Sequence, residues 1–293
     1  MMQITKAVFP VAGLGSRFLP ATKANPKEML PIVDKPLIQY AVEEAVRAGI
    51  THMIFITSAG KRSIEDHFDN QFELESRLQE QGRDHLLSLV KNVSPEGIHF
   101  TYVRQNQPLG LGHAVLCAEH VVGIEPFAVL LADDLIDDAR LPCLAAMTEY
   151  FDSTHHSLLA VQPVPWEDVH QYGVVEIDNR EDDYSNIKAI IEKPEREAAT
   201  SNLAAVGRYV FTPGIFSCLR ETKPDRRGEI QLTDAIQRLL SREPVSVFQF
   251  KGRRYDCGSK LGYIQATVEL GLKHPEIGES FRHYLQTLGC GTR

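Results

Sequence analysis

The segment Val11-Ala-Gly-Leu-Gly-Ser-Arg-Phe18 follows a short apolar run and combines two glycines with a cation. Glycines allow a sharp turn and leave backbone N–H groups open to phosphate oxygens. Gly13 and Gly15 would present those donors. Arg17, together with Lys27 of the nearby Asn-Pro-Lys sequence, would neutralise the phosphates. These residues predict a site for a nucleoside triphosphate, and a plain glycine turn with solvated charges is the alternative interpretation.

The spacing of the glycines excludes two better-known phosphate motifs. A dinucleotide fingerprint that starts at Gly13 needs a glycine where Phe18 stands, which disfavours an NAD-dependent oxidoreductase. A Walker motif needs Gly-Lys-Ser/Thr at a fixed offset, and the sequence lacks it.

Carboxylates stand where a divalent cation could be held. Asp133 and Asp134 follow the apolar run 127–131, at the carboxyl end of a predicted strand, where ligands bind in open α/β sheets. Mg²⁺ takes one or two carboxylates plus phosphate oxygens, so a single partner such as Asp256 would complete the site. Taken alone, the acidic pair also fits a solvated loop, and Asp-Cys-Gly at 256–258 fits a plain turn.

Glu192-Lys193-Pro194 closes the apolar run 187–191, so a carboxylate and an ammonium emerge together at a strand end. Glu192 can accept hydrogen bonds from sugar hydroxyls, and Lys193 can meet a phosphate as a point charge. A solvated strand terminus is the alternative interpretation of this triplet.

Gln105 to Gly112 again lies between a predicted strand and a predicted helix. A side-chain amide has a donor and an acceptor, as the imide edge of a pyrimidine requires, and Gly110 would let the base lie against backbone. Gln107 competes with Gln105 for this role. His113 and His120, on the predicted helix, are interpreted as surface or packing residues rather than as ligands.

Strand-like and helix-like patterns alternate along the first half of the chain, which predicts βαβ units and a mostly parallel, three-layer sheet. A charged insertion, 63–91, predicts helices at the edge of the sheet. Further strand-like runs with fewer helices predict an antiparallel or mixed extension of the same sheet, before a helical tail at 258–288. The predicted strands are 7–11, 53–57, 98–103, 127–131, 158–162, 173–177, 187–191, 206–211 and 245–250, and the predicted helices include 36–49 and 110–122.

Composition narrows the class of protein. The 293 residues suffice for one large α/β domain or two small ones. A net charge of −8 and a pI near 5.8 argue against nucleic acid or an anionic membrane as the main partner.

No signal peptide or membrane span is evident, so a cytoplasmic protein is expected. Five widely spaced cysteines without a C-x-x-C pair predict reduced, mainly buried thiols: Cys117, Cys143, Cys218, Cys257 and Cys290.

Taken in order, these motifs resemble the sugar-1-phosphate nucleotidyltransferases, and in particular the bacterial uridylyltransferase branch of that family, over essentially the whole chain. The resemblance implies a Rossmann-like, three-layer α/β/α fold with a mixed, mainly parallel central sheet. No linker-like, repeated or low-complexity segment is evident, which favours a single domain, 1–293, over two independent ones. Its parts are a nucleotide-binding half (about 1–140), a sugar-phosphate-binding half (about 141–257) and a C-terminal helical segment (about 258–293). Further matching segments are 27–36, 110–118, 172–175, 192–194, 201–203, 206–210, 228–236 and 256–258.

The resemblance also implies an activity, the formation of UDP-glucose and pyrophosphate from UTP and glucose 1-phosphate with Mg²⁺. A thymidylyltransferase and a non-catalytic nucleotide-sugar-binding protein are the alternatives, and a homodimer or homotetramer is expected. The resemblance also implies a role for each site residue. The nucleotide would be held by Ala12, Gly13, Gly15, Gln105 and Gly110, and its triphosphate by Arg17 and Lys27. Mg²⁺ would be held by Asp133 and Asp256, and glucose 1-phosphate by Gly173, Glu192 and Lys193. The catalytic groups would be Arg17, Lys27, Asp133 and Lys193.

Overall fold

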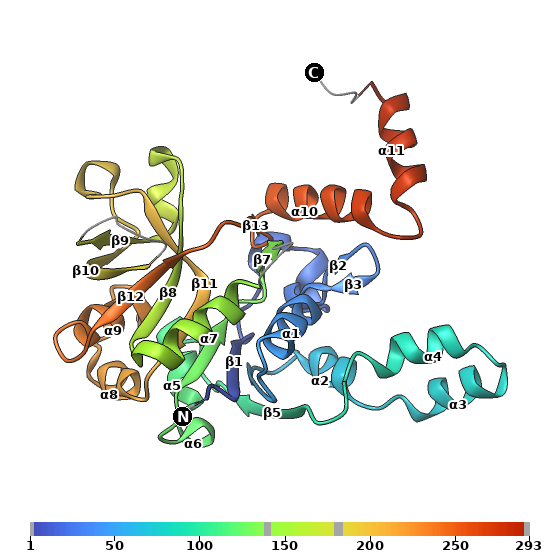
Figure 1. The fold of residues 1–293 in the computed structure, drawn as a ribbon, viewed down its shortest axis with the longest axis horizontal. Helices are drawn as coiled ribbons and strands as arrows, with labels where there is room; N and C mark the ends of the chain where they lie inside the picture. Colours follow the sequence, from blue (N-terminus) through green and yellow to red (C-terminus); the bar gives the residue numbers. More distant parts are fainter. Residues whose placement is uncertain (1–2, 138–141, 179–183, 290–293) are drawn as a thin grey trace.

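The structure is a computed structural model that describes residues 3–137, 142–178 and 184–289. A nine-stranded sheet runs through the molecule in the order β5-β4-β1-β6-β11-β8-β12-β10-β9 (Figure 1). The strands are β1 (Lys6–Pro10), β4 (His52–Thr57), β5 (His99–Arg104), β6 (Phe127–Leu130), β8 (Ser157–Pro163), β9 (Gly173–Ile177), β10 (Tyr184–Glu192), β11 (Leu203–Phe211) and β12 (Val245–Gln249).

Strand directions make the sheet mixed but mainly parallel, which confirms the predicted fold class. Seven strands run the same way, and only β10 and β11 of the described strands oppose them. All nine residues of β11 are buried, as expected for a strand covered on both faces. An extra pairing of Ala204 with Val174 brings β9 back to β11, so the last five strands form a ring.

Helices cover both faces of the sheet and give three layers. Alternate residues of β1 point to opposite faces, with Val8 in one core cluster and Phe9 in the other. The Val8 cluster includes residues of α5 (Leu111–Cys117), α8 (Gly214–Glu221) and α9 (Leu232–Leu239), and the Phe9 cluster includes residues of α1 (Leu37–Arg47), α2 (Arg62–Phe68) and α7 (Cys143–Thr154). The predicted helix 110–122 is divided at Ala118 into α5 and α6 (Glu119–Val122).

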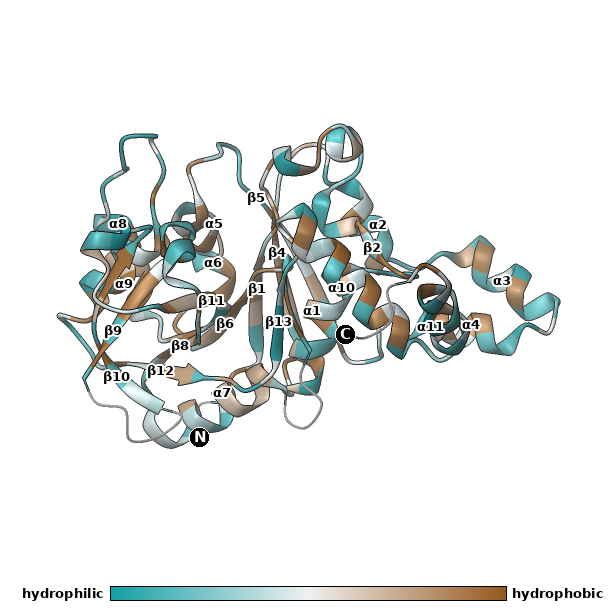
Figure 2. Cartoon of the chain, turned by 90° about the horizontal axis from the view of Figure 1, so that it is seen from above, coloured by the Kyte–Doolittle hydropathy of each residue, from teal (hydrophilic) through white to brown (hydrophobic). Residues whose placement is uncertain are grey.

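The charged insertion forms the predicted helices beside edge strand β5. Beyond α2, α3 (Phe72–Glu80) and α4 (Asp84–Lys91) pack against each other and project from the body as an arm, which carries apolar as well as polar segments (Figure 2). Leu78 is buried in α3, and α4 has no buried residue.

Two short ladders were not anticipated from the sequence. β7 (Asp134–Asp137) pairs with β13 (Arg253–Asp256), and β2 (Pro31–Ile32) pairs with β3 (Lys35–Pro36). The predicted helical tail consists of α10 (Lys260–Lys273) and α11 (Gly278–Thr287). Within the described ranges, no helix combines the length and the apolar character of a membrane span.

The described cysteines are thiols without disulfide bonds, and three of them are buried, as the sequence predicts. Cys117 is half-buried, and Cys290 lies outside the described residues.

Candidate active site

The predicted phosphate loop, residues 11–15, connects β1 to a short 3₁₀ helix, Ser16–Phe18. Gly15 has a φ of 65°, and a Cβ there would lie 3.3 Å from the Cβ of Lys27, so position 15 favours glycine. Gly13 does not adopt a positive φ, and a Cβ on it would meet no atom within 4 Å. The predicted sharp turn therefore falls at Gly15, whereas the space over Gly13 is open to a ligand.

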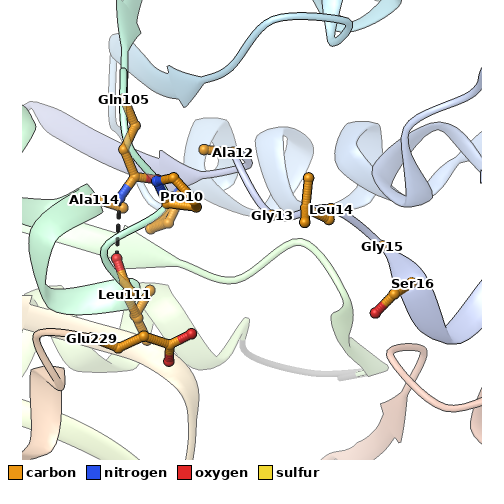
Figure 3. A pocket seen from close by; sticks show the side chains of 12 residues that line it. Pro10, Ala12, Gly13, Leu14, Gly15, Ser16, Gln105, Leu111, Ala114 and Glu229 are labelled. Atoms are coloured by element: carbon orange, nitrogen blue, oxygen red, sulfur yellow. Dashed lines mark hydrogen bonds between the residues drawn. The ribbon is translucent and has the colours of Figure 1, made fainter. Parts of the chain in front are cut away.

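A pocket of about 390 Å³ opens between this loop and the start of α5 (Figure 3). Gln105 lines it and is buried, whereas Gln107 is exposed and does not line it. The five predicted nucleotide-binding residues all line this pocket: Ala12, Gly13, Gly15, Gln105 and Gly110.

Packing of the protein itself requires glycine at position 110. Gly110 has a φ of 92°, and a Cβ there would lie 2.8 Å from the Cβ of Glu229. The backbone N–H of Ile230 donates to the carbonyl of Leu109, and the N–H of Gly112 donates to the carbonyl of Ile230. These bonds fix Glu229 against the pocket.

Lys27 and Asp133 form an ion pair, with Nζ 2.6 Å from Oδ2. Burial disfavours charge on both groups, but their mutual attraction outweighs it, so the pKa of Lys27 is raised and the pKa of Asp133 is lowered. Arg17 lies nearby and donates from Nη1 to the carbonyl of Gly258 at 3.4 Å. The predicted cations of the triphosphate site thus surround the predicted metal ligand.

The β7–β13 ladder brings the two predicted metal ligands together. It pairs Asp134 with Asp256, and the N–H of Cys257 donates to the carbonyl of Asp133 at 2.8 Å. A Cβ on Gly258 would stand 2.9 Å from Oδ2 of Asp133 and 3.0 Å from Oδ1 of Asp256, so glycine leaves the space between the two carboxylates open.

The charge of this pair suits a hard divalent cation. Burial, together with the carboxylates of Asp134 and Asp133, raises the pKa of Asp256, and a cation would relieve this repulsion. The described residues contain no cluster of three or more metal-ligating side chains. The two carboxylates of Asp133 and Asp256, on either side of the open space at Gly258, would suit a cation that takes its remaining ligands from phosphate and water.

A second pocket, of about 290 Å³, adjoins the first. The pairing of β9 with β10 sets Gly173 opposite Glu192, whose Oε2 accepts a hydrogen bond from Thr233 at 3.0 Å. Lys193 has a φ of 43°, and its N–H donates to the carbonyl of Tyr172. The predicted residues that line this pocket are Arg17, Asp133, Gly173, Glu192, Lys193 and Asp256.

Behind Asp133 lies a buried polar network that the sequence reasoning missed. Arg208 donates to Oε2 of Glu44 at 2.8 and 3.0 Å and to the carbonyls of Leu131 and Asp134 at 3.1 and 2.8 Å. The carboxylate of Asp134 accepts hydrogen bonds from Arg254 and from the N–H of Gly207. The sequence did contain a sign of this network, an arginine inside the apolar run 203–211. Fully buried arginines are rare, so such a residue indicates a buried polar partner.

Comparison with known proteins decides the family. A family model described as nucleotidyl transferase matches residues 6–271. The chain belongs to the nucleotidyl transferase family. A UTP–glucose-1-phosphate uridylyltransferase of Staphylococcus haemolyticus, a member of similar length, is 48% identical over 289 residues, which are 99% of this chain and 100% of the relative.

Solved structures extend the same similarity to the fold. A UTP-bound UGPase from Acinetobacter baumannii superposes with a TM-score of 0.91 at 45% identity, covering 97% of this chain and 99% of that one. A UDP-glucose pyrophosphorylase complexed with UDP-glucose has a TM-score of 0.85 at 47% identity, covering 92% and 100%. These findings confirm the resemblance that the sequence motifs indicate and the nucleotidyltransferase fold.

Proposed function

We infer that this nucleotidyltransferase makes UDP-glucose and pyrophosphate from UTP and glucose 1-phosphate. The arrangement of the two pockets carries this inference. They share Leu111 and Glu229, and Arg17 and Asp133 lie in the second pocket beside the phosphate loop of the first. A nucleotide in the first pocket would place its phosphates next to a sugar phosphate in the second. Similarity to uridylyltransferases over nearly the whole chain supports this choice of substrates.

The expected roles follow from the charges and positions of the side chains. Gln105 and the backbone at Gly110 would hold the base, and Arg17 and Lys27 would neutralise the triphosphate. Glu192 would accept hydrogen bonds from glucose hydroxyls, while Lys193 would bind the sugar phosphate. The remaining contacts would come from Ala12, Gly13 and Gly15 to the nucleotide and from Gly173 to the sugar.

The reaction needs no general base and no covalent enzyme intermediate. An ionised phosphate oxygen of glucose 1-phosphate attacks the α-phosphorus of UTP. One P–O bond forms there as the bond to the β-phosphate oxygen breaks, and pyrophosphate leaves with that electron pair. The protein aligns the two anions and offsets their repulsion, mainly through Lys193 and Arg17.

Mg²⁺ is the proposed cofactor, held by Asp133 and Asp256. When bound, it would neutralise phosphate charge beside the reacting atoms. Lys27 contacts Oδ2 of Asp133 at 2.6 Å, so the ammonium would lie beside the cation and the triphosphate.

Pyrophosphate release from a panel of nucleoside triphosphates and sugar 1-phosphates tests the proposed function. We expect release from UTP with glucose 1-phosphate in the presence of Mg²⁺ and none in excess chelator. Asp133→Asn should lose several orders of magnitude in kcat while remaining folded. A preference for dTTP would instead identify a thymidylyltransferase, and binding without turnover would identify a non-catalytic member of the family.

Family resemblance and composition support further proposals about the context of the enzyme. We propose a single domain whose halves, about 1–140 and 141–257, bind nucleotide and sugar phosphate. We also propose a cytoplasmic homodimer or homotetramer with small-molecule substrates rather than nucleic acid or membrane partners. Light scattering of the purified protein would test the oligomeric state.

A further inference from the structure

His113 contacts Gln105 from behind the nucleotide pocket. It lies on α5, is half-buried, and is not among the residues that line the pocket. Its Nδ1 is 2.9 Å from Nε2 of Gln105, and the same Nε2 donates to the carbonyl of Gly110 at 3.2 Å (Figure 3 shows the bond to Gly110). Its contact with Gln105 is thus a hydrogen-bonded link between His113 and the nucleotide pocket.

The two contacts use both hydrogens of the Gln105 amide. The carbonyl of Gly110 can only accept, so the nitrogen end of the amide must face it. The second N–H then points to Nδ1 of His113, which accepts only while it carries no proton. No described residue donates to Oε1 of Gln105, so this carbonyl oxygen remains available as an acceptor for a ligand in the pocket that Gln105 lines.

We propose that His113 is a positioning residue that holds the Gln105 amide with Oε1 toward the base, so that the pocket selects uracil over cytosine. Uracil has an N–H donor at N3, which Oε1 can accept, whereas N3 of cytosine is itself an acceptor and would face Oε1 unpaired. Thymine shares the N3 donor, so this contact does not separate UTP from dTTP. The proposal rests on the proposed binding of UTP.

The protonation state of His113 fits this role. Burial lowers the pKa of His113, which favours the neutral ring at neutral pH. The titratable neighbour in contact with Nδ1 is Cys117 on the same helix, with Sγ at 3.9 Å, and burial raises the pKa of this thiol, so it stays uncharged. Gln105, on the facing segment, does not titrate. Protonation of Nδ1 would place its N–H against the N–H of Gln105 Nε2. Because two donors cannot pair, this would favour rotation of the Gln105 amide, which moves Oε1 away from the base.

The experiment compares kcat/KM for UTP and CTP in the wild type, His113→Ala and His113→Asn. Removal of the imidazole should lower the UTP/CTP preference by about tenfold or more and leave KM for glucose 1-phosphate unchanged. In His113→Asn, Oδ1 can replace Nδ1 as the acceptor, so the preference should be largely restored. His120→Ala, which removes an exposed histidine from α6, is the matched control and should behave as the wild type.

A pH profile supplies a readout that loss of packing would not change. Between about pH 5 and 8 the wild-type UTP/CTP preference should fall as the pH falls through the pKa of His113, and His113→Asn should lose the part of this dependence that His113 supplies. The triphosphates of UTP and CTP ionise alike, so their titration cancels in the ratio. Protonation of cytosine N3 at the acidic end of the range affects both proteins alike, so the difference between the wild type and His113→Asn reports His113.

Equal losses for UTP and CTP in His113→Ala, or a wild-type ratio independent of pH, would overturn the proposal. If His113→Ala does not fold, the pH profiles of the wild type and His113→Asn decide the question. If the wild type forms no UDP-glucose, the proposed function fails separately, and calorimetric binding of UTP and CTP to the same variants still tests the role of His113.

Discussion

Lys193 lies at the end of β10, where its ammonium contacts Oε1 of Glu192 at 2.8 Å and reaches the second pocket. Half of its side chain remains exposed, so the ammonium is free to move to an incoming phosphate. Because Lys193 lines this pocket with Gly173 and Glu192, we expect it to meet the sugar phosphate rather than the nucleotide.

We predict that Lys193→Ala raises KM for glucose 1-phosphate at least about tenfold and changes KM for UTP little, because a charged hydrogen bond to one substrate is lost. Steady-state kinetics with each substrate varied in turn would measure the two constants. An equal rise of both would place Lys193 on the triphosphate.

The two glutamines after β5 allow a matched comparison of base recognition. Gln105 is buried in the nucleotide pocket and Gln107 is exposed, so Gln105→Ala should weaken UTP binding by about 1–3 kcal/mol. Gln107→Ala should leave UTP binding nearly unchanged. Titration calorimetry with UTP checks both variants, and a larger loss in Gln107→Ala would assign the base contact to that residue.

The residues predicted for the site, apart from Lys27, all line one of the two pockets, but other lining residues, Glu229 among them, were not predicted. Lys27 lies against Gly15, but its ion pair with Asp133 joins positions 106 residues apart in the sequence. The contact of His113 with Gln105 depends on how α5 docks against the strand end. Contacts that depend on tertiary packing produce no pattern that can be recognised in a single sequence.

At the level of elements, the loop from β6 to β7 is held by the buried ion pair of Arg208 with Glu44 of α1. Arg208 is 1% exposed and also hydrogen-bonds the carbonyls of Leu131 and Asp134, on either side of Asp133. Strand β11, helix α1 and the candidate metal ligand are thereby fixed relative to one another.

Arg208→Met should lower the free energy of unfolding by about 3–5 kcal/mol, because it leaves the carboxylate of Glu44 buried without its cation. The double variant Glu44→Gln/Arg208→Met should recover part of this loss, since no buried charge remains unpaired. Urea unfolding of the two single variants and the double variant would measure the coupling. Strictly additive losses would contradict a direct interaction.

The long apolar strands and amphipathic helices of the sheet were predictable because burial on one or both faces gives them a clear pattern. β7 and β13 were missed because each has four residues and is largely charged, with Arg253, Arg254 and Asp256 in β13. Their pairing joins positions about 120 residues apart. Nothing local in either segment specifies its partner.

At the level of the whole molecule, the arm formed by α3 and α4 is separable from the sheet. Phe68 precedes the arm and Ser94 follows it, and Oγ of Ser94 donates to the carbonyl of Phe68 at 2.5 Å. The chain therefore leaves the body of the protein and returns to it at nearly the same place. Phe72, at the start of α3, is 81% exposed, and α4 buries none of its residues.

Replacing residues 70–92 with a Gly-Gly linker should therefore leave the fold and the formation of UDP-glucose intact, because few buried contacts are lost and the closing distance is short. Circular dichroism, thermal unfolding and pyrophosphate release would check this. Loss of the cooperative unfolding transition would show that the arm is part of the folding unit. Light scattering of the same variant would report whether the arm contributes to assembly.

The backbone of Lys193 implies a trade-off between stability and activity. Its φ of 43° lies in the left-handed region, which a lysine occupies at a cost of about 1–2 kcal/mol and glycine occupies freely. Lys193→Gly should therefore be more stable than Lys193→Ala by about 1 kcal/mol, although both lack the ammonium. Thermal unfolding of the two variants would detect the difference, and equal stability would contradict it. Selection for catalysis would then have kept a charged residue at a position where the backbone alone favours glycine.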